Sequence, residues 1–316
     1  MAAMKVLISD KIEEVCPRRL REFAGIEVVE KEGLAPAALL QEIKGCIGLI
    51  VRSATKVTRE VIEAGAGLKV IGRAGAGVDN IDVKAATTKG IVVMNTPGGN
   101  ANAVAELTIA LMLALARELP RGDATMKAGK WEKKSFLGTE LAGKTLGLIG
   151  IGFVGSRVAA KAKGLEMKVQ VYDPFVSPDE SKRLGAEMVE LDALLASSDY
   201  VSLHLPKTPE TAGMVNKQMI AKMKRGVFLI NCARGGIVND ADLLAGLSSG
   251  QVAGAAVDVY DPEPPADWAL AKHPRVVAMP HIGATTAEAQ EIVARMIAEQ
   301  VGAYLTTGKV KFAVNA

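Results

Sequence analysis

The regular alternation of short apolar runs with helix-like segments constrains the fold of this chain most. A first series of predicted strands covers 5–9, 26–30, 47–53, 69–75 and 91–96. A second series covers 144–150, 168–173, 200–205, 226–233, 252–260 and 275–281. Strands that alternate with helices are typical of a parallel sheet covered by helices. We therefore expect an α/β protein.

The two series predict two doubly wound parallel-sheet domains. Five strands are typical of a flavodoxin-like sheet, and six match a Rossmann dinucleotide-binding sheet. The pattern breaks at Pro97 and the two glycines after it, and an alanine-rich helix at 285–305 is expected to pack back on the first domain. We therefore expect a discontinuous substrate-binding domain, 1–97 and 285–316, and a dinucleotide-binding domain at 98–284.

The overall charge argues against two classes of partner. The net charge of this 316-residue chain is only +3, so no basic field points to nucleic acid or to an anionic membrane. The longest apolar stretch, 103–117, is interrupted by Glu106 and is too short to span a bilayer. This stretch is predicted to be a buried or interfacial helix. We expect neither nucleic acid nor membrane as a partner.

Cysteine usage and the N-terminus point to one compartment. Cys16, Cys46 and Cys232 are an odd and scattered set without a CxxC pair. This argues for a reducing compartment and against a disulfide framework or a zinc site. A predicted strand begins almost at once, which leaves no room for a signal peptide. A cytoplasmic protein without a metal site is expected.

A glycine motif follows the first strand of the second series. Gly150-x-Gly152-x-x-Gly155 is a weak signal alone, but here it lies between an apolar strand and a helix, as the dinucleotide motif requires. The glycines permit a tight turn, close approach of a pyrophosphate and close packing of helix on strand. The backbone N–H groups of Phe153 and Val154 are then expected to face the phosphates.

The residue at the end of the next strand indicates which dinucleotide binds. A carboxylate at Asp173 would accept hydrogen bonds from both ribose hydroxyls and repel a 2′-phosphate. Pro174 and Phe175 follow, and no arginine is present there to bind such a phosphate. We therefore expect NAD rather than NADP. The competing interpretation is a cluster of packing glycines with a surface aspartate.

Three histidines are candidates for an acid/base, because the ordinary pKa of histidine lies near neutrality. His273 lies in a polar turn and is expected to be solvated. His204 ends an interior strand and either lines the adenine side or is a hydrogen-bonded core residue. His281 ends the last strand, at the carboxyl edge where open α/β sheets bind ligands. His281 is the favoured acid/base.

Two charged residues follow neighbouring strands. Glu263 lies between prolines and would stabilise a charged His281, although the pattern around it alone favours a solvated turn residue. Arg234 precedes a Gly235–Gly236 turn, and alone it is equally a loop arginine. Because Arg234, Glu263 and His281 follow successive strand ends of one sheet, they are expected to converge. A guanidinium there can hold a carboxylate through two hydrogen bonds.

Two further roles concern the nicotinamide end of a cofactor. The Gly235–Gly236 turn is interpreted as letting the backbone clear the nicotinamide ring. Asp258 ends its strand and either holds the carboxamide or serves as a turn aspartate. Both assignments depend on the dinucleotide site predicted above.

Together these residues resemble the D-isomer-specific 2-hydroxyacid dehydrogenases. The matching segments extend over nearly the whole chain: "LIVRSATKVT", "GRAGAGVDNID", "NTPGGN", "AELTIALMLALAR", "GKTLGLIGIGFVG", "NCARGGIV", "AAVDVY", "EPP" and "PHIGA". The resemblance implies NAD-dependent oxidation at C2 of a 2-hydroxyacid. It makes His281 the acid/base, Glu263 its partner and Arg234 the anchor of the substrate carboxylate.

The resemblance also implies two sets of binding residues. The NAD set is Ala76, Gly150, Gly152, Phe153, Val154, Gly155, Asp173, Leu205, Pro206, Cys232, Ala233, Arg234, Asp258, His281, Ile282, Gly283 and Ala284. The substrate set is Arg52, Ser53, Arg73, Gly75, Asn100, Arg234, His281, and Lys133 and Lys134 of a neighbouring subunit. Ala76 and Leu205 stand where close relatives can carry threonine, so a hydroxyl contact to the cofactor is absent at both.

Within the family, "GKWEKKSFLGTEL" and "VRSATKVT" favour 3-phosphoglycerate as substrate, in the first step of phosphorylated serine synthesis. A glyoxylate or hydroxypyruvate reductase and an NAD-sensing corepressor-type binding protein are the alternatives.

The chain stops at "FAVNA", where many relatives continue. A short form without regulatory domains, and without feedback inhibition by serine, is expected. At least a homodimer is expected, because helix 103–117 is apolar on more faces than one domain covers.

Overall fold

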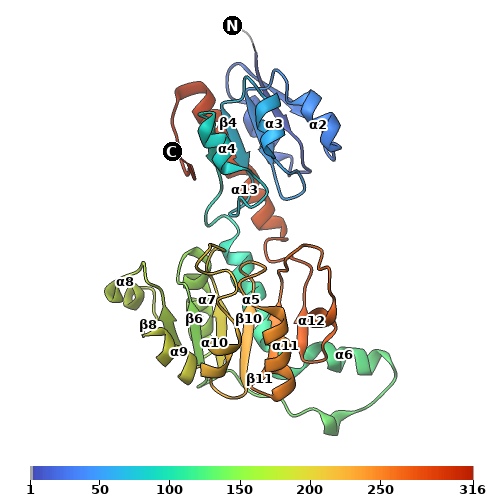
Figure 1. Ribbon diagram of the computed structural model, residues 1–316, viewed down its shortest axis with the longest axis vertical. Helices are drawn as coiled ribbons and strands as arrows, with labels where there is room; N and C mark the ends of the chain where they lie inside the picture. Colours follow the sequence, from blue (N-terminus) through green and yellow to red (C-terminus); the bar gives the residue numbers. More distant parts are fainter. Residues whose placement is uncertain (1–2, 316) are drawn as a thin grey trace. The chain divides into compact units, whose positions relative to one another are not determined.

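The computed structural model describes residues 3–315, so residues 1, 2 and 316 at the ends of the expected domain ranges lie outside it. The chain forms two compact units (Figure 1). Unit 1 comprises Met1–Ala101 and Thr285–Ala316, and unit 2 comprises Asn102–Ala284. Each unit contains one parallel sheet, which confirms the predicted α/β class with two parallel-sheet domains.

Unit 1 contains a five-stranded sheet in the order β2-β1-β3-β4-β5, which is the flavodoxin-like order. Its elements are β1 (Met4–Ile8), α1 (Val15–Arg21), β2 (Ile26–Glu30), α2 (Pro36–Glu42), β3 (Gly48–Val51), α3 (Arg59–Ala64), β4 (Val70–Arg73), α4 (Val83–Thr88), β5 (Val92–Met94) and α13 (Ala287–Thr307).

Helices cover both faces of this sheet. Strand β3 is buried at all four positions, and a run without polar alternation is typical of a strand that is covered on both sides. Val293 and Ile297 of α13 pack with Ile8 and Ile50 on one face. The approach of α13 is close, since a Cβ at Gly72 of β4 would lie 2.8 Å from Ile297. The last helix of the chain thus completes the core of unit 1.

Unit 2 contains a seven-stranded sheet in the order β12-β11-β10-β9-β6-β7-β8. Its elements are α5 (Ala101–Arg117, whose first residue is assigned to unit 1), α6 (Leu119–Lys127), the 3-10 helix η1 (Lys133–Ser135), β6 (Thr145–Ile149), α7 (Phe153–Gly164), β7 (Lys168–Tyr172), α8 (Pro178–Arg183), β8 (Glu187–Met188), α9 (Leu191–Ser197), β9 (Tyr200–Leu203), α10 (Lys217–Lys222), β10 (Val227–Asn231), α11 (Asp240–Ser249), β11 (Val252–Val257), α12 (Ala269–Lys272) and β12 (Val276–Ala278).

The strand count of this sheet corrects one prediction. In chain order within the unit the sheet reads 3-2-1-4-5-6 with a seventh strand added beyond the sixth, so it contains the Rossmann order. The sequence predicted six strands and missed β8, the third of the seven. Strand β8 is only two residues long and pairs with β7 alone. Two residues carry no alternation by which a strand can be recognised.

Two helical layers cover the sheet of unit 2. Residues of α5 and α7, such as Met112 and Val158, form one core with Leu148 of β6. Residues of α9, α10 and α11 form the other core, for example Leu194 and Leu247. Among residues 3–315, no helix combines the length and the apolar character needed to cross a bilayer. The three cysteines are free and buried.

The burial of α5 contradicts the argument that its apolar faces need a second copy of the chain to cover them. Residues Val104, Leu111, Met112 and Leu115 of this helix lie in the core of unit 2 itself. Of the apolar residues of α5, Leu113 is the one large side chain that is exposed. The helix therefore satisfies its apolar faces within one chain, and its composition is no evidence for a second copy.

Candidate active site

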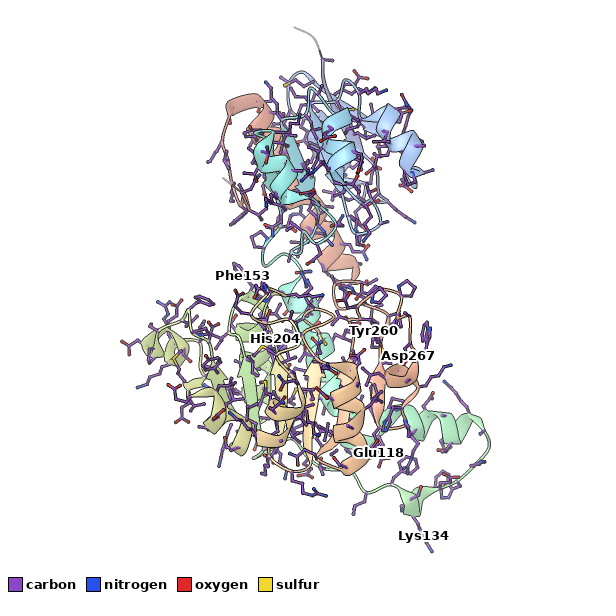
Figure 2. The ribbon with its side chains drawn as sticks, in the orientation of Figure 1. Glu118, Lys134, Phe153, His204, Tyr260 and Asp267 are labelled. Atoms are coloured by element: carbon purple, nitrogen blue, oxygen red, sulfur yellow. The ribbon has the colours of Figure 1, made fainter. Side chains whose placement is uncertain are left out.

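The candidate site lies at the carboxyl edge of the seven-stranded sheet. Gly150 follows β6, Asp173 follows β7, Asp258 follows β11, and His281 lies shortly after β12. Because all strands in this sheet run parallel, their carboxyl ends meet at one edge. Figure 2 shows Phe153, His204 and Tyr260 at the same end of unit 2.

His281 and Glu263 are in direct contact. Nδ1 of His281 lies 2.7 Å from Oε2 of Glu263. The other carboxylate oxygen, Oε1, accepts a hydrogen bond of 3.0 Å from the backbone N–H of Tyr260. Both side chains remain partly exposed, at 46% and 38%. With Nδ1 facing a carboxylate acceptor, Nε2 is the ring nitrogen that can take a proton from a reactant.

The backbone at His281 is strained, and Asp258 holds it. His281 has a φ of 54°, a left-handed conformation that costs a non-glycine residue about 1–2 kcal/mol. The carboxylate of Asp258 accepts hydrogen bonds of 2.8 Å from the N–H groups of both Ile282 and Gly283. Burial raises the pKa of the Asp258 carboxyl. Of the two alternatives for Asp258, the turn aspartate describes these contacts. Strain of this kind is a feature of functional sites.

Arg234 projects from a turn that a buried asparagine organises. Asn231 Nδ2 donates a hydrogen bond of 3.0 Å to the Arg234 carbonyl, and Asn231 Oδ1 accepts a hydrogen bond of 3.1 Å from the Ala233 N–H. Nη1 of Arg234 donates to the Ala233 carbonyl at 2.7 Å. The sequence interpretation missed Asn231. Its signal was available, because a polar residue at the end of a buried strand needs a partner.

Gly235 ties this turn to the His281–Glu263 contact. A Cβ at Gly235 would lie 1.9 Å from the carbonyl oxygen of Tyr260, whose N–H binds Glu263. The residue must therefore be glycine whatever ligand is bound. The backbone contact with Tyr260 by itself explains the glycine at 235, so the space needed by a nicotinamide ring is not required as the explanation.

The glycine motif forms an open cradle at the start of α7. Gly152 is the N-cap of this helix and offers no side-chain cap, and a Cβ there would meet no atom within 4 Å. At Gly150, whose φ is 95°, a Cβ would lie 2.4 Å from the His204 carbonyl oxygen. At Gly155 it would lie 2.4 Å from the Gly150 carbonyl oxygen. Uncapped N–H groups facing open space suit a phosphate.

The carboxylate of Asp173 lies against this cradle. It accepts hydrogen bonds of 2.9 Å from Ile151 N–H and 3.0 Å from Phe175 N–H. Each carboxylate oxygen can accept a further bond, so both remain able to bind a ribose hydroxyl. The cradle and Asp173 together fit a dinucleotide.

The other residues of the predicted NAD set have varied surroundings. Leu205 and Pro206 lie shortly beyond β9, and Cys232 and Ala233 follow β10. Burial raises the pKa of the Cys232 thiol to about 12, so this side chain is not a nucleophile. Ala76 belongs to unit 1, where its carbonyl accepts 2.6 Å from Asn95 Nδ2.

His204 is half-buried just beyond β9 and makes one side-chain hydrogen bond. Its Nε2 lies 2.9 Å from Ser202 Oγ, and burial lowers the pKa of His204 to about 4. At neutral pH the ring is therefore uncharged. The contact with Ser202 is compatible with both alternatives, a hydrogen-bonded core histidine and a residue that lines the adenine side.

The predicted substrate residues of unit 1 lie at the carboxyl edge of its own sheet. Arg52 and Ser53 follow β3, and Arg73 ends β4. The side chain of Arg73 folds over Gly75, where a Cβ would lie 1.3 Å from Nη1 of Arg73. Asn100, the last of this set, is half-buried.

Lys133 and Lys134 are not brought to the site within one chain. Both lie exposed in η1, and Figure 2 shows Lys134 at the opposite end of unit 2 from Phe153, His204 and Tyr260. In the part of the chain that the structure describes, no cluster of three or more His, Cys, Asp or Glu could hold a metal ion.

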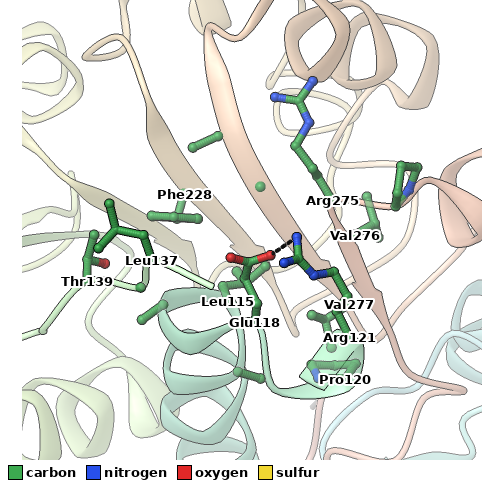
Figure 3. Close-up of a pocket in the computed structure, with 16 residues that line it drawn as sticks. Leu115, Glu118, Pro120, Arg121, Leu137, Thr139, Phe228, Arg275, Val276 and Val277 are labelled. Atoms are coloured by element: carbon green, nitrogen blue, oxygen red, sulfur yellow. Dashed lines mark ion pairs between the residues drawn. The ribbon is translucent and has the colours of Figure 1, made fainter. Parts of the chain in front are cut away.

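A separate cavity of about 330 Å³ lies at the amino ends of β10, β11 and β12 (Figure 3). Phe228, Leu115 and Val277 line it, together with an ion pair in which Arg121 Nη1 lies 2.8 Å from Glu118 Oε2. Because the candidate catalytic residues follow the carboxyl ends of the strands, this cavity is not the candidate active site.

A comparison with known protein families now assigns the chain. Residues 109–283 match the description "D-isomer specific 2-hydroxyacid dehydrogenase, NAD binding domain". The chain belongs to the D-isomer specific 2-hydroxyacid dehydrogenase family. The match confirms the family expected from the sequence and the NAD-binding domain within it.

Similar proteins are consistent with this D-isomer specific 2-hydroxyacid dehydrogenase assignment. The chain is 49% identical to D-3-phosphoglycerate dehydrogenase of Homo sapiens over 296 residues, which is 94% of this chain and 55% of the human protein. The chain thus spans about half the length of the curated relatives it matches.

Two solved structures cover at least 99% of the chain. The NAD⁺-bound 3-phosphoglycerate dehydrogenase of Entamoeba histolytica is 35% identical, with a TM-score of 0.84 over 100% of this chain and 99% of that one. A glyoxylate reductase of Paecilomyes thermophila is 31% identical, with a TM-score of 0.90 over 99% of both chains. The fold of the family therefore covers nearly all of the chain.

Proposed function

We propose that this family member oxidises the C2 hydroxyl of 3-phospho-D-glycerate to 3-phosphohydroxypyruvate with NAD, the first step of phosphorylated L-serine biosynthesis. The contact of 2.7 Å between His281 and Glu263 carries the proposal, because it creates an oriented acid/base at the cofactor edge. The relatives named above as 3-phosphoglycerate dehydrogenases support this choice of substrate.

His281 acts as the base in this reaction. Glu263 accepts a hydrogen bond from the N–H at Nδ1, so Nε2 carries the lone pair that removes the hydroxyl proton. As the imidazole becomes charged, the carboxylate of Glu263 stabilises it, and the Tyr260 N–H keeps that carboxylate in place. When bound, NAD supplies the acceptor for the hydride that leaves C2.

The cradle at the start of α7 would hold the pyrophosphate of NAD. The N–H groups of Phe153 and Val154 would bind its oxygens, and Gly152 leaves the space open. Asp173 would accept hydrogen bonds from the ribose hydroxyls and would repel a 2′-phosphate. The turn at 281–284 and the residues after β10 would border the nicotinamide.

Arg234 binds the carboxylate of the substrate. A guanidinium offers two parallel N–H donors to a carboxylate, which also fixes the position of the adjacent C2. The turn braced by Asn231 fixes where this side chain begins. Arg52 and Arg73 of unit 1 bind the phosphate end of the substrate.

A homodimer, at the least, is the assembly we propose. The segment from α6 to residue 140 extends from the body of unit 2 (Figure 1). It exposes Trp131 at 78% and Leu137 at 94%, and large apolar side chains this exposed are typical of a contact surface. A second copy would cover them and bring Lys133 and Lys134 to the neighbouring active site. Sedimentation as a stable monomer at micromolar concentration would contradict this arrangement.

We place the enzyme in the cytoplasm. Cys16, Cys46 and Cys232 are free thiols, which a reducing compartment maintains.

A glyoxylate or hydroxypyruvate reductase is the second candidate. The likeness to the glyoxylate reductase of Paecilomyes thermophila favours it, and the reaction would use the same three catalytic residues on a smaller substrate. The phosphate is the difference between the two candidates.

Turnover on four substrates decides between them. The purified chain is assayed with NAD and 3-phosphoglycerate, D-glycerate or D-lactate, and in reverse with NADH and glyoxylate. We expect kcat/KM for 3-phosphoglycerate to exceed the other two forward values. A chain that reduces glyoxylate well but turns over 3-phosphoglycerate no better than D-glycerate is the rival reductase.

A further inference from the structure

We propose that Asp10 and Asn80 are positioning residues that fix the loop at 52–55 and thereby aim Arg52 at the substrate phosphate. This inference rests on the proposed function, in which Arg52 binds that phosphate. Neither Asp10 nor Asn80 belongs to the predicted site. Their contacts form a clamp on both sides of one short loop, and Asp10 and Asn80 are together called the loop clamp below.

The topology of unit 1 places Asp10 beside this loop. Strands β1 and β3 are parallel neighbours in which Ile8 pairs with Ile50. The same register carries Asp10 and Arg52 to neighbouring positions at the carboxyl edge of the sheet. Asp10 is only 5% exposed, which is rare for a charged side chain without strong partners.

Asp10 binds the donor groups of the loop. Oδ2 accepts a hydrogen bond of 2.6 Å from the backbone N–H of Arg52. Oδ1 accepts 3.0 Å from the N–H of Thr55 and 2.6 Å from its hydroxyl. A carboxylate only accepts hydrogen bonds, and those to an ionised acceptor are about twice as strong as neutral ones. One buried carboxylate therefore holds both ends of the loop.

Asn80 binds the acceptor groups of the same two residues. Its Nδ2 donates hydrogen bonds of 2.7 Å to the Arg52 carbonyl and 2.7 Å to the Thr55 carbonyl. The backbone reinforces this side, because Val57 N–H donates 2.8 Å to the Asn80 carbonyl. The N–H and C=O groups of both Arg52 and Thr55 are thus satisfied by two side chains from elsewhere in unit 1.

The clamp decides where the Arg52 guanidinium can reach. With its N–H and C=O fixed, Arg52 can move only by side-chain rotation. Its Nη1 approaches the Lys11 carbonyl at 3.3 Å and Gln290 Oε1 at 3.4 Å, and the side chain is half-buried. A binding group held by packing and supporting hydrogen bonds loses little entropy when it meets its ligand. The same loop carries Ser53, which is exposed at its centre.

The decisive variants are Asp10→Asn and Asn80→Ala, measured as the full chain with NAD. We expect KM for 3-phosphoglycerate to rise about tenfold or more, the loss expected when a charge-assisted contact is no longer aimed, with kcat changed less than about twofold. D-Glycerate has no phosphate, so its kcat/KM should stay within about twofold of wild type. The ratio of the two kcat/KM values should therefore fall in both variants.

Two matched controls come from the same unit. Asp82 caps α4 by accepting 2.8 Å from the Ala85 N–H, and Asn315 bridges the backbone near β5 through Val93 N–H at 2.8 Å. Asp82→Asn and Asn315→Ala make the same chemical changes at side chains whose hydrogen bonds go to α4 and to the segment around β5 rather than to the loop at 52–55. They should leave the substrate ratio unchanged even where they lower the melting temperature.

A double-mutant cycle with Arg52→Ala separates positioning from a general loss of structure. If Asp10 acts through Arg52, adding Asp10→Asn to Arg52→Ala should raise KM for 3-phosphoglycerate no further. Full additivity of the two changes, or equal losses on both substrates in Asp10→Asn alone, would overturn the inference.

Amide hydrogen exchange tests the loop clamp independently of the enzyme assay. The amides of Arg52 and Thr55 should lose protection in Asp10→Asn and keep it in Asp82→Asn. Unchanged protection in Asp10→Asn would show that no clamp exists. A wild-type chain without activity on 3-phosphoglycerate, or an Arg52→Ala variant with unchanged KM, would instead refute the proposed function while the exchange result stands by itself.

Discussion

Oε2 of Glu263 lies 2.7 Å from Nδ1 of His281, while the second oxygen of the same carboxylate is bound by a backbone N–H. A carboxylate held at both oxygens cannot rotate away, so the imidazole keeps one tautomer and one orientation. Because His281 also occupies a left-handed backbone conformation, the chain accepts a local cost to hold the ring there.

Replacing His281 with alanine should remove the acid/base while leaving the cradle intact. We expect kcat to fall by about 10²–10⁴-fold, the typical contribution of a positioned acid/base. Glu263→Gln should lower kcat less, because the amide still contacts the ring but cannot stabilise its charge. Steady-state rates combined with NAD titration by tryptophan fluorescence check this. Weakened NAD binding equal to the loss of rate would assign His281 to the cofactor site instead.

Two glycines of one motif should respond differently to alanine. A Cβ at Gly152 meets no atom, so Gly152→Ala should keep the melting temperature but raise the dissociation constant for NAD. A Cβ at Gly155 meets the Gly150 carbonyl oxygen at 2.4 Å, so Gly155→Ala should destabilise unit 2 by about 1–3 kcal/mol. Calorimetry and NAD titration measure both. A Gly152→Ala variant that binds NAD normally would show that the pyrophosphate lies elsewhere.

Asp173→Ala should narrow the preference for NAD over NADP, chiefly through KM. The carboxylate repels a 2′-phosphate, but it also braces the cradle through Ile151 N–H. Asp173→Asn separates these effects, since it keeps an acceptor oxygen and removes the charge. Both variants should gain relative activity with NADP. A wild-type chain that already prefers NADP would contradict the assignment of this residue.

The stability difference between wild type and Asp258→Asn should depend on pH. Burial raises the pKa of Asp258, so the folded chain holds this proton more tightly than the unfolded chain. The contribution of Asp258 is therefore fully present below the unfolded value of about 4 and is lost as pH rises through the raised pKa. Urea unfolding from pH 4 to pH 8 should show wild type losing stability relative to the variant. A constant difference would contradict this.

The sequence predicts the fold well where an element is recognisable from the pattern of its own neighbouring residues. Strands β1, β3 and β6 are mainly apolar runs of four or five residues, and the glycine motif lies between a strand and a helix. Each signal is contained within a few neighbouring residues. Strand β8 has two residues and is stabilised by its pairing with β7, so the local sequence does not predict it.

The site is predictable only in part, for the same reason. Arg234, Glu263 and His281 could be inferred because each follows a recognisable strand. No local pattern indicates the role of Asp10, because its partners Arg52 and Thr55 lie 42 and 45 positions away and meet it only through the pairing of β1 with β3. The surroundings of α5 likewise depend on packing that composition cannot show.

The most direct test of 3-phosphoglycerate as the substrate measures kcat/KM for 3-phosphoglycerate and for D-glycerate in wild type, Arg52→Ala and Arg73→Ala. We expect each arginine variant to lose about tenfold to a hundredfold on 3-phosphoglycerate, as for a lost charge-assisted hydrogen bond, and to change little on D-glycerate. Equal losses on both substrates would show that these arginines do not bind the phosphate, and the glyoxylate or hydroxypyruvate reductase would then be the better assignment.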